Sequence, residues 1–252
     1  MVKIKLCFER GDGMRLDKLV SNCGFGSRKE VKYLMKQGLV TVDGQIVTKP
    51  ETHVDPTVCK VCVGEHVIEY EKYSYLIMNK PAGVISATYD EVEQTVCDLL
   101  EDRYVMGDVF PVGRLDKDTT GLLILSNDGG FAHRVLSPKK KIDKVYHAAL
   151  NKPFGEKEIK AFEAGVVLDD DYKTMPAGLL SLDEDGLLAQ VTIKEGKYHQ
   201  VKRMFAAVGI NVLALKRVSF AGIALDEVLA PGEYRRLTDA ELDKVSNLLS
   251  KD

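Results

Sequence analysis

A short run of four apolar residues, Leu122 to Leu125, places the strongest constraint on how this chain can fold. Its length and composition are those of a buried strand. A polar loop, residues 114–121, comes directly before it, and Gly113 and Gly121 permit sharp backbone turns at the two ends of that loop. A loop held against a buried strand is a common place for a reactive group, because the rigid strand fixes its position.

The loop carries two carboxylates, Asp116 and Asp118, among the basic residues Arg114 and Lys117. In one interpretation these charges pair with one another in a solvated surface turn. In the other they form a functional site, and the spacing alone leaves both interpretations open. For Asp118 we expect a structural role, because aspartate side chains commonly accept hydrogen bonds from backbone N–H groups two or three residues further on.

The charge balance argues against a globally basic nucleic-acid binder. The 252 residues, enough for one or two domains, include 35 basic and 38 acidic residues. The charges are nevertheless segregated, with basic residues in excess in segments 14–50 and 194–217. Local basic patches still bind phosphate, because electrostatic steering depends on the local field.

Cysteine usage and hydropathy indicate a reduced, cytoplasmic protein. The five cysteines show no paired framework, and no second pair follows Cys59 and Cys62, so we expect no metal site. The sequence contains no apolar run of about 18 residues, so we expect no membrane span. Residues 1–13 do not form a signal peptide, since two lysines interrupt their apolar stretch. They could be a strand, a disordered lead or a segment before a later start at Met14.

The segment 14–70 has the pattern of a small domain of two helices and a hairpin. Ser27 and Glu30 form a predicted capping box before a helix that buries Val31, Leu34 and Met35, and the Asp-Gly pair at 43–44 predicts a hairpin turn. This arrangement resembles the RNA-binding domain of ribosomal protein S4. Its basic side chains would then contact phosphate, although an ordinary solvated helix face is the other interpretation. The residues concerned are Arg15, Lys18, Arg28, Lys29, Lys32 and Lys36.

The central loop and strand carry a second resemblance. The words GRLD and DTTGLLIL closely resemble the catalytic loop of pseudouridine synthases of the RsuA-like branch, which modify ribosomal RNA. Further motifs of that family stand in the expected order, so the resemblance covers nearly everything from Met14 onward. These motifs are LIMNKPAGVISAT at 76–88, KVY at 144–146, YHQVKRMF at 198–205 and LAPGEYRRLTDAEL at 229–242.

The resemblance implies a catalytic set. Asp116 would be the catalytic aspartate, acting on the sugar at C1′, and Tyr146 would stack on the target base. Lys202, or alternatively Arg203, would contact Asp116 and favour its ionised form. The residues implied for base flipping or phosphate contact are Arg114, Arg203, Gln200 and Lys80. No metal or organic cofactor is expected, because the reaction is an isomerisation without redox change.

The implied reaction converts a uridine in ribosomal RNA into pseudouridine after the base leaves the stack. The form YHQVKRM is typical of enzymes for the small subunit, which points to precursor 16S rRNA as partner and to its uridine-516-type site. A large-subunit (23S) synthase of the same branch is one alternative. A non-catalytic S4-like RNA-binding protein is the other.

These inferences combine into an α+β fold. We expect an S4-like RNA-binding domain at 14–70 and a catalytic domain at 74–252, with a mixed, mostly antiparallel sheet flanked by helices. Asp116, Tyr146 and Lys202 should converge in a cleft across that sheet. A monomer is the expected oligomeric state.

Overall fold

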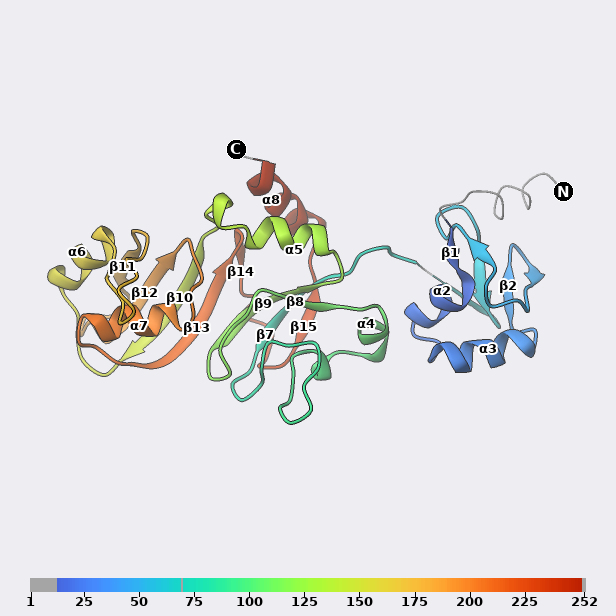
Figure 1. Ribbon diagram of the computed structural model, residues 1–252, viewed down its shortest axis with the longest axis horizontal. Helices are drawn as coiled ribbons and strands as arrows, with labels where there is room; N and C mark the ends of the chain where they lie inside the picture. The colour runs from blue at the N-terminus through green and yellow to red at the C-terminus, as the bar shows by residue number, and fades with distance from the viewer. Residues whose placement is uncertain (1–12, 69, 251–252) are drawn as a thin grey trace. The chain divides into compact units, whose positions relative to one another are not determined.

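The computed structural model describes residues 13–68 and 70–250, which form two compact units (Figure 1). Unit 1 takes in the described residues up to Ser74 together with the segment Leu100–Val109. Unit 2 takes in Tyr75–Leu99 and the chain from Phe110 onward. The N-terminal extension predicted at residues 1–13 lies, except for Gly13, outside the described residues.

Unit 1 contains three helices and six short strands among its described residues, and four of the strands form a sheet in the order β3-β2-β5-β6. The elements are β1 (Met14–Arg15), α2 (Leu16–Asn22), α3 (Arg28–Lys36), β2 (Val40–Val42), β3 (Gln45–Ile46), β4 (His53–Val54), β5 (Val61–Val63), β6 (His66–Val67) and α4 (Asp102–Met106).

The local signals in unit 1 form the predicted structures. Ser27 caps α3 in a capping box with Glu30, and the hairpin of β2 and β3 turns at residues 43–44. Buried residues of α2, α3 and the sheet, among them Leu16, share one core. Cys59 is disulfide-bonded, so the expectation that no cysteines are paired is wrong at this position.

Unit 2 is built on one nine-stranded sheet. Its elements are β7 (Tyr75–Lys80), the 3-10 helix η1 (Cys97–Leu99), β8 (Phe110–Val112), β9 (Thr120–Ser126), α5 (Gly129–Leu136), the 3-10 helix η2 (Pro138–Lys140), β10 (Lys144–Leu150), α6 (Glu156–Ala164), β11 (Gly178–Ser181), β12 (Leu188–Ile193), α7 (Gln200–Ala207), β13 (Val212–Phe220), β14 (Ile223–Ala224), β15 (Tyr234–Arg236) and α8 (Asp239–Ser250).

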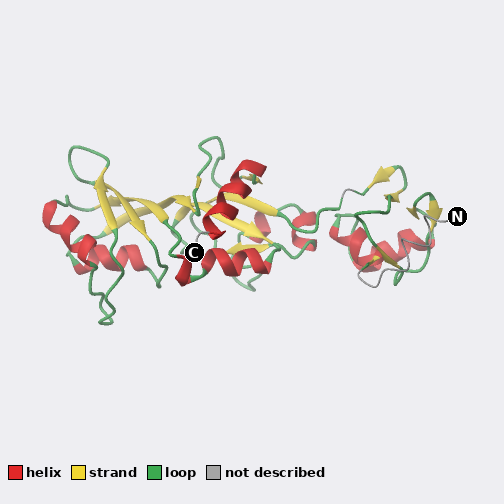
Figure 2. Ribbon diagram, turned by 90° about the horizontal axis from the view of Figure 1, so that it is seen from above, coloured by secondary structure: helices red, strands yellow, loops and turns green. Residues whose placement is uncertain are grey.

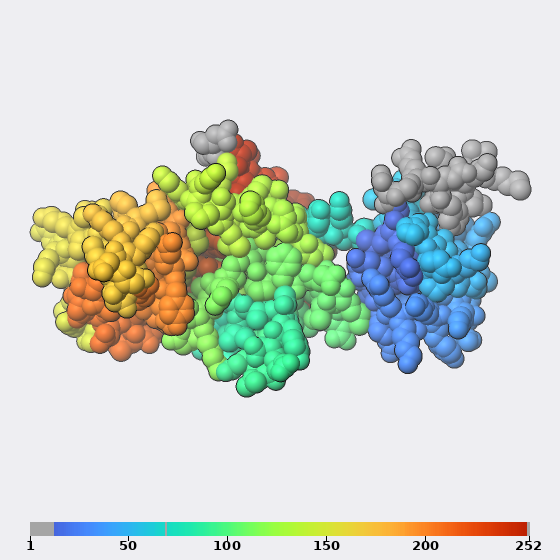
Figure 3. All heavy atoms as spheres, viewed as in Figure 1, coloured from blue at the N-terminus to red at the C-terminus, as the bar shows by residue number. Residues whose placement is uncertain are grey.

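The sheet is mixed and mostly antiparallel, which confirms the predicted α+β class. Its main path runs β11-β12-β10-β13-β9-β7-β15, with β14 paired to β13 and β8 paired to β9. Only the pairing between β13 and β9 is parallel among the described strands. There the orange and green segments lie side by side in the space-filling view (Figure 3). The parallel contact joins the two halves of the sheet and brings distant parts of the chain together.

Helices cover the sheet and close its core (Figure 2). Apolar residues of α5 and α8, including Phe131 and Val245, pack on Leu122 and Ile124 of β9, which is the buried strand that the sequence predicts. In the other half of the sheet, α6 and α7 meet through Phe162 and Phe205, whose ring centroids lie 5.0 Å apart. The core therefore fixes β9 and β13, the two strands next to the loop of interest.

Candidate active site

A buried lysine donates hydrogen bonds to the backbone of the loop that precedes β9. Lys80, at the end of β7, is fully buried, and its ammonium donates to the carbonyl oxygens of Asp116 and Thr119 at 3.1 and 2.9 Å and to those of Pro81 and Lys117 at 3.0 and 3.3 Å. Burial lowers the pKa of Lys80 to about 8, against the opposing charges of the loop aspartates. The expectation that Lys80 contacts phosphate does not fit this position, because its donors already serve the loop backbone.

A serine fixes the other side of the loop. Ser86 Oγ accepts from the backbone N–H of Leu115 at 3.0 Å and donates to the carbonyl oxygen of the same residue at 3.0 Å. Leu115 itself is buried, so it anchors the residue next to Asp116. The carboxylate of Asp116 is thereby presented from a fixed backbone, with 28% of its side chain exposed.

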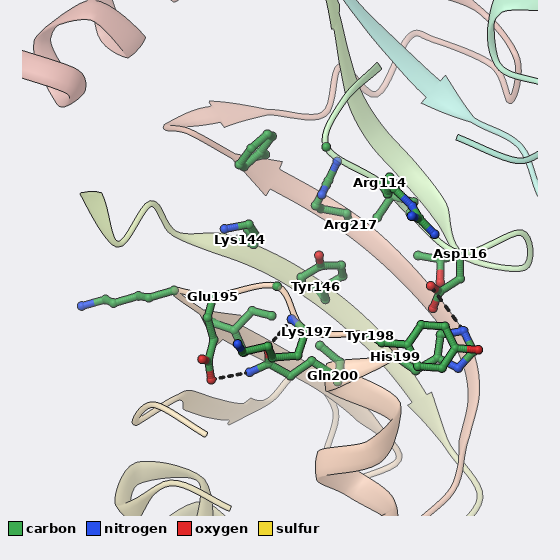
Figure 4. A pocket seen from close by; sticks show the side chains of 18 of the residues that line it. Arg114, Asp116, Lys144, Tyr146, Glu195, Lys197, Tyr198, His199, Gln200 and Arg217 are labelled. Atoms are coloured by element: carbon green, nitrogen blue, oxygen red, sulfur yellow. Dashed lines mark hydrogen bonds and ion pairs between the residues drawn. The ribbon is translucent and has the colours of Figure 1, made fainter. Parts of the chain in front are cut away.

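Two cationic or polar groups from the start of α7 reach this carboxylate. Lys202 Nζ lies 3.4 Å from Asp116 Oδ2. His199 Nε2 lies 3.5 Å from Asp116 Oδ1 (Figure 4). His199 adopts a left-handed backbone conformation, with φ of 49°, directly before the first turn of α7. Such a conformation is costly for a residue other than glycine and is often found at functional sites.

Lys202 serves two carboxylates at once. Its ammonium donates to Asp118 Oδ1 at 2.6 Å, in addition to its contact with Asp116. The hydrogen bond from Lys202 lowers the pKa of Asp118 below its usual range. Asp118 therefore contacts α7, whereas the sequence predicts that it caps the turn at residues 119–121.

Two of the predicted contact residues are occupied elsewhere. The guanidinium of Arg203 pairs with Asp169 and Asp170, which excludes it as the partner of Asp116 in this structure. Gln200 is 4% exposed, donates to Glu195 at 2.8 Å and accepts from the Lys197 N–H at 2.9 Å. Its amide thus holds the turn before α7, and the predicted phosphate contact does not fit its burial.

A pocket of about 600 Å³ opens beside Asp116, within unit 2. Tyr146 of β10 lines it and is 7% exposed, so its ring forms part of the pocket wall. Arg114 lies on the same lining and is exposed. In Figure 4, Asp116 and His199 are at one end of the group of labelled side chains and Lys144 is at the other.

Two basic residues also line the pocket. Lys144 and Arg217 both line it, and burial together with the charge of Arg217 lowers the pKa of Lys144 to about 8. Arg217 is 2% exposed, and its Nε donates to the carbonyl oxygen of Leu122 at 2.8 Å. The pocket therefore combines a carboxylate, an aromatic wall and buried positive charge.

The sequence reasoning left four of these residues out of the site. His199 lies one helical turn before the predicted Lys202, and nothing in the neighbouring sequence indicates its positive φ angle. Lys144 lies inside the KVY motif, which could have indicated it. Arg217 interrupts an apolar strand, a signal that a buried charge is present, and Asp118 was set aside as a cap.

The predicted basic residues of unit 1 differ in their environment. Arg15 is engaged with Asp17 through hydrogen bonds of 3.0 and 2.9 Å, and Lys18 is half-buried. The other four are exposed on or at the start of α3, namely Arg28, Lys29, Lys32 and Lys36. We call these four exposed side chains the basic stripe of α3.

Neither a metal cluster nor a membrane helix is found in residues 13–68 and 70–250. No group of three or more His, Cys, Asp or Glu side chains there is arranged to hold a metal ion. Within the same residues, no helix has the length and apolar character needed to cross a membrane.

Comparison with protein families matches both parts of the chain. Residues 74–207 match the RNA pseudouridylate synthase family, and residues 14–58 match the S4 domain. The first match covers more than half of the chain and contains the Asp116 loop, Tyr146 and Lys202.

Individual relatives match over almost their full length. An RNA pseudouridine synthase of Bacillus subtilis named YtzG, described as uncharacterized, is 49% identical over 91% of this chain and 97% of its own. The ribosomal small subunit pseudouridine synthases A of Vibrio cholerae and Escherichia coli are 40% and 38% identical, each over 92% of this chain and at least 99% of their own. A crystal structure of a pseudouridylate synthase superposes with a TM-score of 0.65 and 34% identity, covering 92% of this chain and 99% of that one.

Proposed function

Because this chain belongs to the RNA pseudouridylate synthase family, as a synthase of the RsuA type that acts on ribosomal RNA, we propose that it modifies the uridine-516-type site of 16S rRNA. Relatives named for the small ribosomal subunit support this target at 38–40% identity. The motif YHQVKRM at 198–204 supports it as well, whereas a 23S rRNA target is the alternative. The single observation that carries the mechanism is the ion pair of Asp116 with Lys202 at the pocket.

Asp116 acts at C1′ of the target nucleotide. In the reaction the bond from C1′ to N1 breaks, the uracil turns, and a bond from C1′ to C5 forms while C5 loses its proton and N1 gains one. An ionised Asp116 serves either by attacking C1′ or by removing a proton from the sugar. Lys202 favours the ionised carboxylate at a distance of 3.4 Å.

Tyr146 and Arg114 bind and position the flipped nucleotide. A base inside a helix cannot reach the carboxylate, so the nucleotide must be flipped into the pocket. The largely buried ring of Tyr146 is the platform on which the uracil stacks. Arg114 is exposed at the pocket and can take the place of the flipped base or bind a phosphate.

The basic stripe of α3 gives affinity for the RNA backbone. Residues 14–70 act as the RNA-binding domain and residues 74–252 as the catalytic domain. The four exposed side chains of the stripe bind phosphates, which positions the enzyme without reading sequence. The stripe residues are Arg28, Lys29, Lys32 and Lys36.

The enzyme acts as a monomer on the small-subunit precursor. An rRNA substrate supports a cytoplasmic location for the enzyme.

The assignment of Asp116 is tested by Asp116→Asn. We expect pseudouridine formation to be lost while thermal stability and RNA affinity stay close to those of the wild type. Pseudouridine is measured by carbodiimide treatment and primer extension on 16S rRNA from a strain that lacks the gene and is complemented with each variant. The control is Asp185→Asn, an exposed carboxylate in the turn between β11 and β12, which should leave activity unchanged. Full activity of Asp116→Asn would end the assignment, and a modified site in 23S rRNA would replace the proposed target.

A further inference from the structure

One donor of the buried residue Arg217 has no hydrogen-bond partner within residues 13–68 and 70–250. The side chain is held on two sides, because Nε donates to the Leu122 carbonyl oxygen and the guanidinium carbon lies 4.7 Å from the ring centroid of Phe220. The Nη2 atom is buried and makes no hydrogen bond. A buried donor on a charged group that stays unpaired destabilises the folded protein, so such an atom requires an explanation.

The strand register places this donor beside the aromatic wall of the pocket. Arg217 on β13 is the direct cross-strand partner of Tyr146 on β10. Side chains of such partners stand next to each other on the same face of a sheet, with Cβ atoms about 4.5–5.5 Å apart. Both residues line the same pocket, so an atom stacked on Tyr146 would be within reach of Arg217.

We propose that Arg217 Nη2 donates a hydrogen bond to O4 of the target uracil and so selects uridine over cytidine. The inference rests on the proposed stacking of the base on Tyr146. A backbone phosphate is a poorer candidate for this donor, because Arg217 is 2% exposed and the flipped base enters the pocket more deeply than the strand that carries it.

The chemistry of the two pyrimidines explains the selection. Uracil presents an acceptor at O4 where cytosine presents an amino donor. A cytosine in the same pose would face a buried N–H donor with another donor, which leaves both unpaired. Sites built to hydrogen-bond a substrate group reject analogues that lack it far more strongly than apolar pockets do.

The same donor suits the product. Turning the uracil so that C5 takes the place of N1 also exchanges the positions of O2 and O4. A fixed donor therefore meets a carbonyl oxygen before and after the turn. Arg217 is held by strand β13, by Leu122 and by Phe220, so it can stay in place while the base moves.

The test replaces the carbonyl oxygen and the donor in turn. RNA fragments span the uridine that the wild-type enzyme modifies and carry uridine, 2-thiouridine or 4-thiouridine at that position, since sulfur is a weaker acceptor. We expect 4-thiouridine to lower kcat/KM of the wild type by roughly 10- to 100-fold. A loss below about twofold for 4-thiouridine, or a loss confined to 2-thiouridine, would overturn the proposal without any variant.

The protein arm uses Arg217→Met, with Arg217→Lys as a second variant that keeps the positive charge in the core. Either folded variant should act more slowly on uridine and show a smaller penalty for sulfur than the wild type. Lys144→Met is the matched control and should keep the full sulfur penalty. An unchanged sulfur penalty in Arg217→Met, or a uniform loss of RNA affinity with a weaker salt dependence, would instead assign Arg217 to phosphate.

The two proposals fail separately. The sulfur penalty is a ratio of rates for one enzyme, so it does not depend on which group attacks the sugar. An active Asp116→Asn variant would overturn the proposed catalytic role and leave the Arg217 result standing.

Discussion

Lys202 Nζ lies 3.4 Å from Asp116 Oδ2, although the two residues are far apart in the sequence of unit 2. Asp116 belongs to the loop before β9, and Lys202 belongs to the first turn of α7. The adjacent residue Arg203 turns away to Asp169 and Asp170. Which of the two basic neighbours serves the carboxylate is thus settled by the side of the helix on which each stands.

Lys202→Met should lower kcat while leaving RNA affinity nearly unchanged. A charge-assisted hydrogen bond contributes about 1.5–3 kcal/mol, so its loss corresponds to a roughly 10- to 100-fold slower turnover. Single-turnover rates with saturating enzyme measure this effect. Arg203→Met is the matched control, because its side chain pairs with Asp169 and Asp170, and it should slow turnover less than about threefold. Equal losses in both variants would show that the contact with Asp116 has no special importance.

Lys80→Met should release the loop that carries Asp116. The substitution leaves four backbone carbonyl oxygens without their buried donor, and we expect a loss of more than about 2 kcal/mol of stability together with slower turnover. Hydrogen exchange of the Thr119 amide should become faster. Lys117→Met, which breaks only an exposed ion pair with Glu93, should cost less than about 1 kcal/mol. Unaltered exchange in Lys80→Met would contradict this role.

Gly121→Ala should prevent unit 2 from folding normally. Gly121 has a φ of +97°, and a Cβ atom there would lie 2.2 Å from the carbonyl oxygen of Arg217 across the parallel pairing of β9 and β13. Backbone strain and this clash together should cost more than about 3 kcal/mol. Solubility and the thermal midpoint are the measurements. Gly129→Ala, where a Cβ atom meets nothing within 4 Å, is the control and should melt close to the wild type.

The free energy of unfolding should depend on pH through the ionisation of Glu241. Its carboxylate accepts from Arg235 at two distances of 2.8 Å, and these bonds, chiefly, lower its pKa to about 2 from 4.5. A lowered carboxyl pKa contributes stability that is present above pH 4.5 and is lost as the pH falls toward 2. Glu241→Gln should therefore be less stable than the wild type by about 1–2 kcal/mol at neutral pH, because solvent screens part of the interaction. Chemical denaturation across the pH range should show this difference vanish near pH 2, and a constant difference would refute the assignment.

The elements themselves could be predicted from the sequence. The apolar run of β9, the capping box of α3 and the turn at 43–44 depend on residues close together in the chain, and local periodicity reports them. The mixed, mostly antiparallel sheet followed from the family resemblance, as did the choice of Asp116, Tyr146 and Lys202. The structure brings Asp116 and Lys202 into contact and places Tyr146 on the same pocket.

Only the tertiary structure decided what each charged side chain touches. The family resemblance assigned Lys80, Gln200 and Arg203 the same role as Arg114, namely base flipping or phosphate contact. The sequence near a motif does not show whether a basic or polar side chain is buried or exposed. Folding turns the Lys80 ammonium inward onto the loop carbonyls and leaves one donor of Arg217 unpaired beside Tyr146. Burial and long-range pairing set these partners, and neither quantity is contained in a local stretch of sequence.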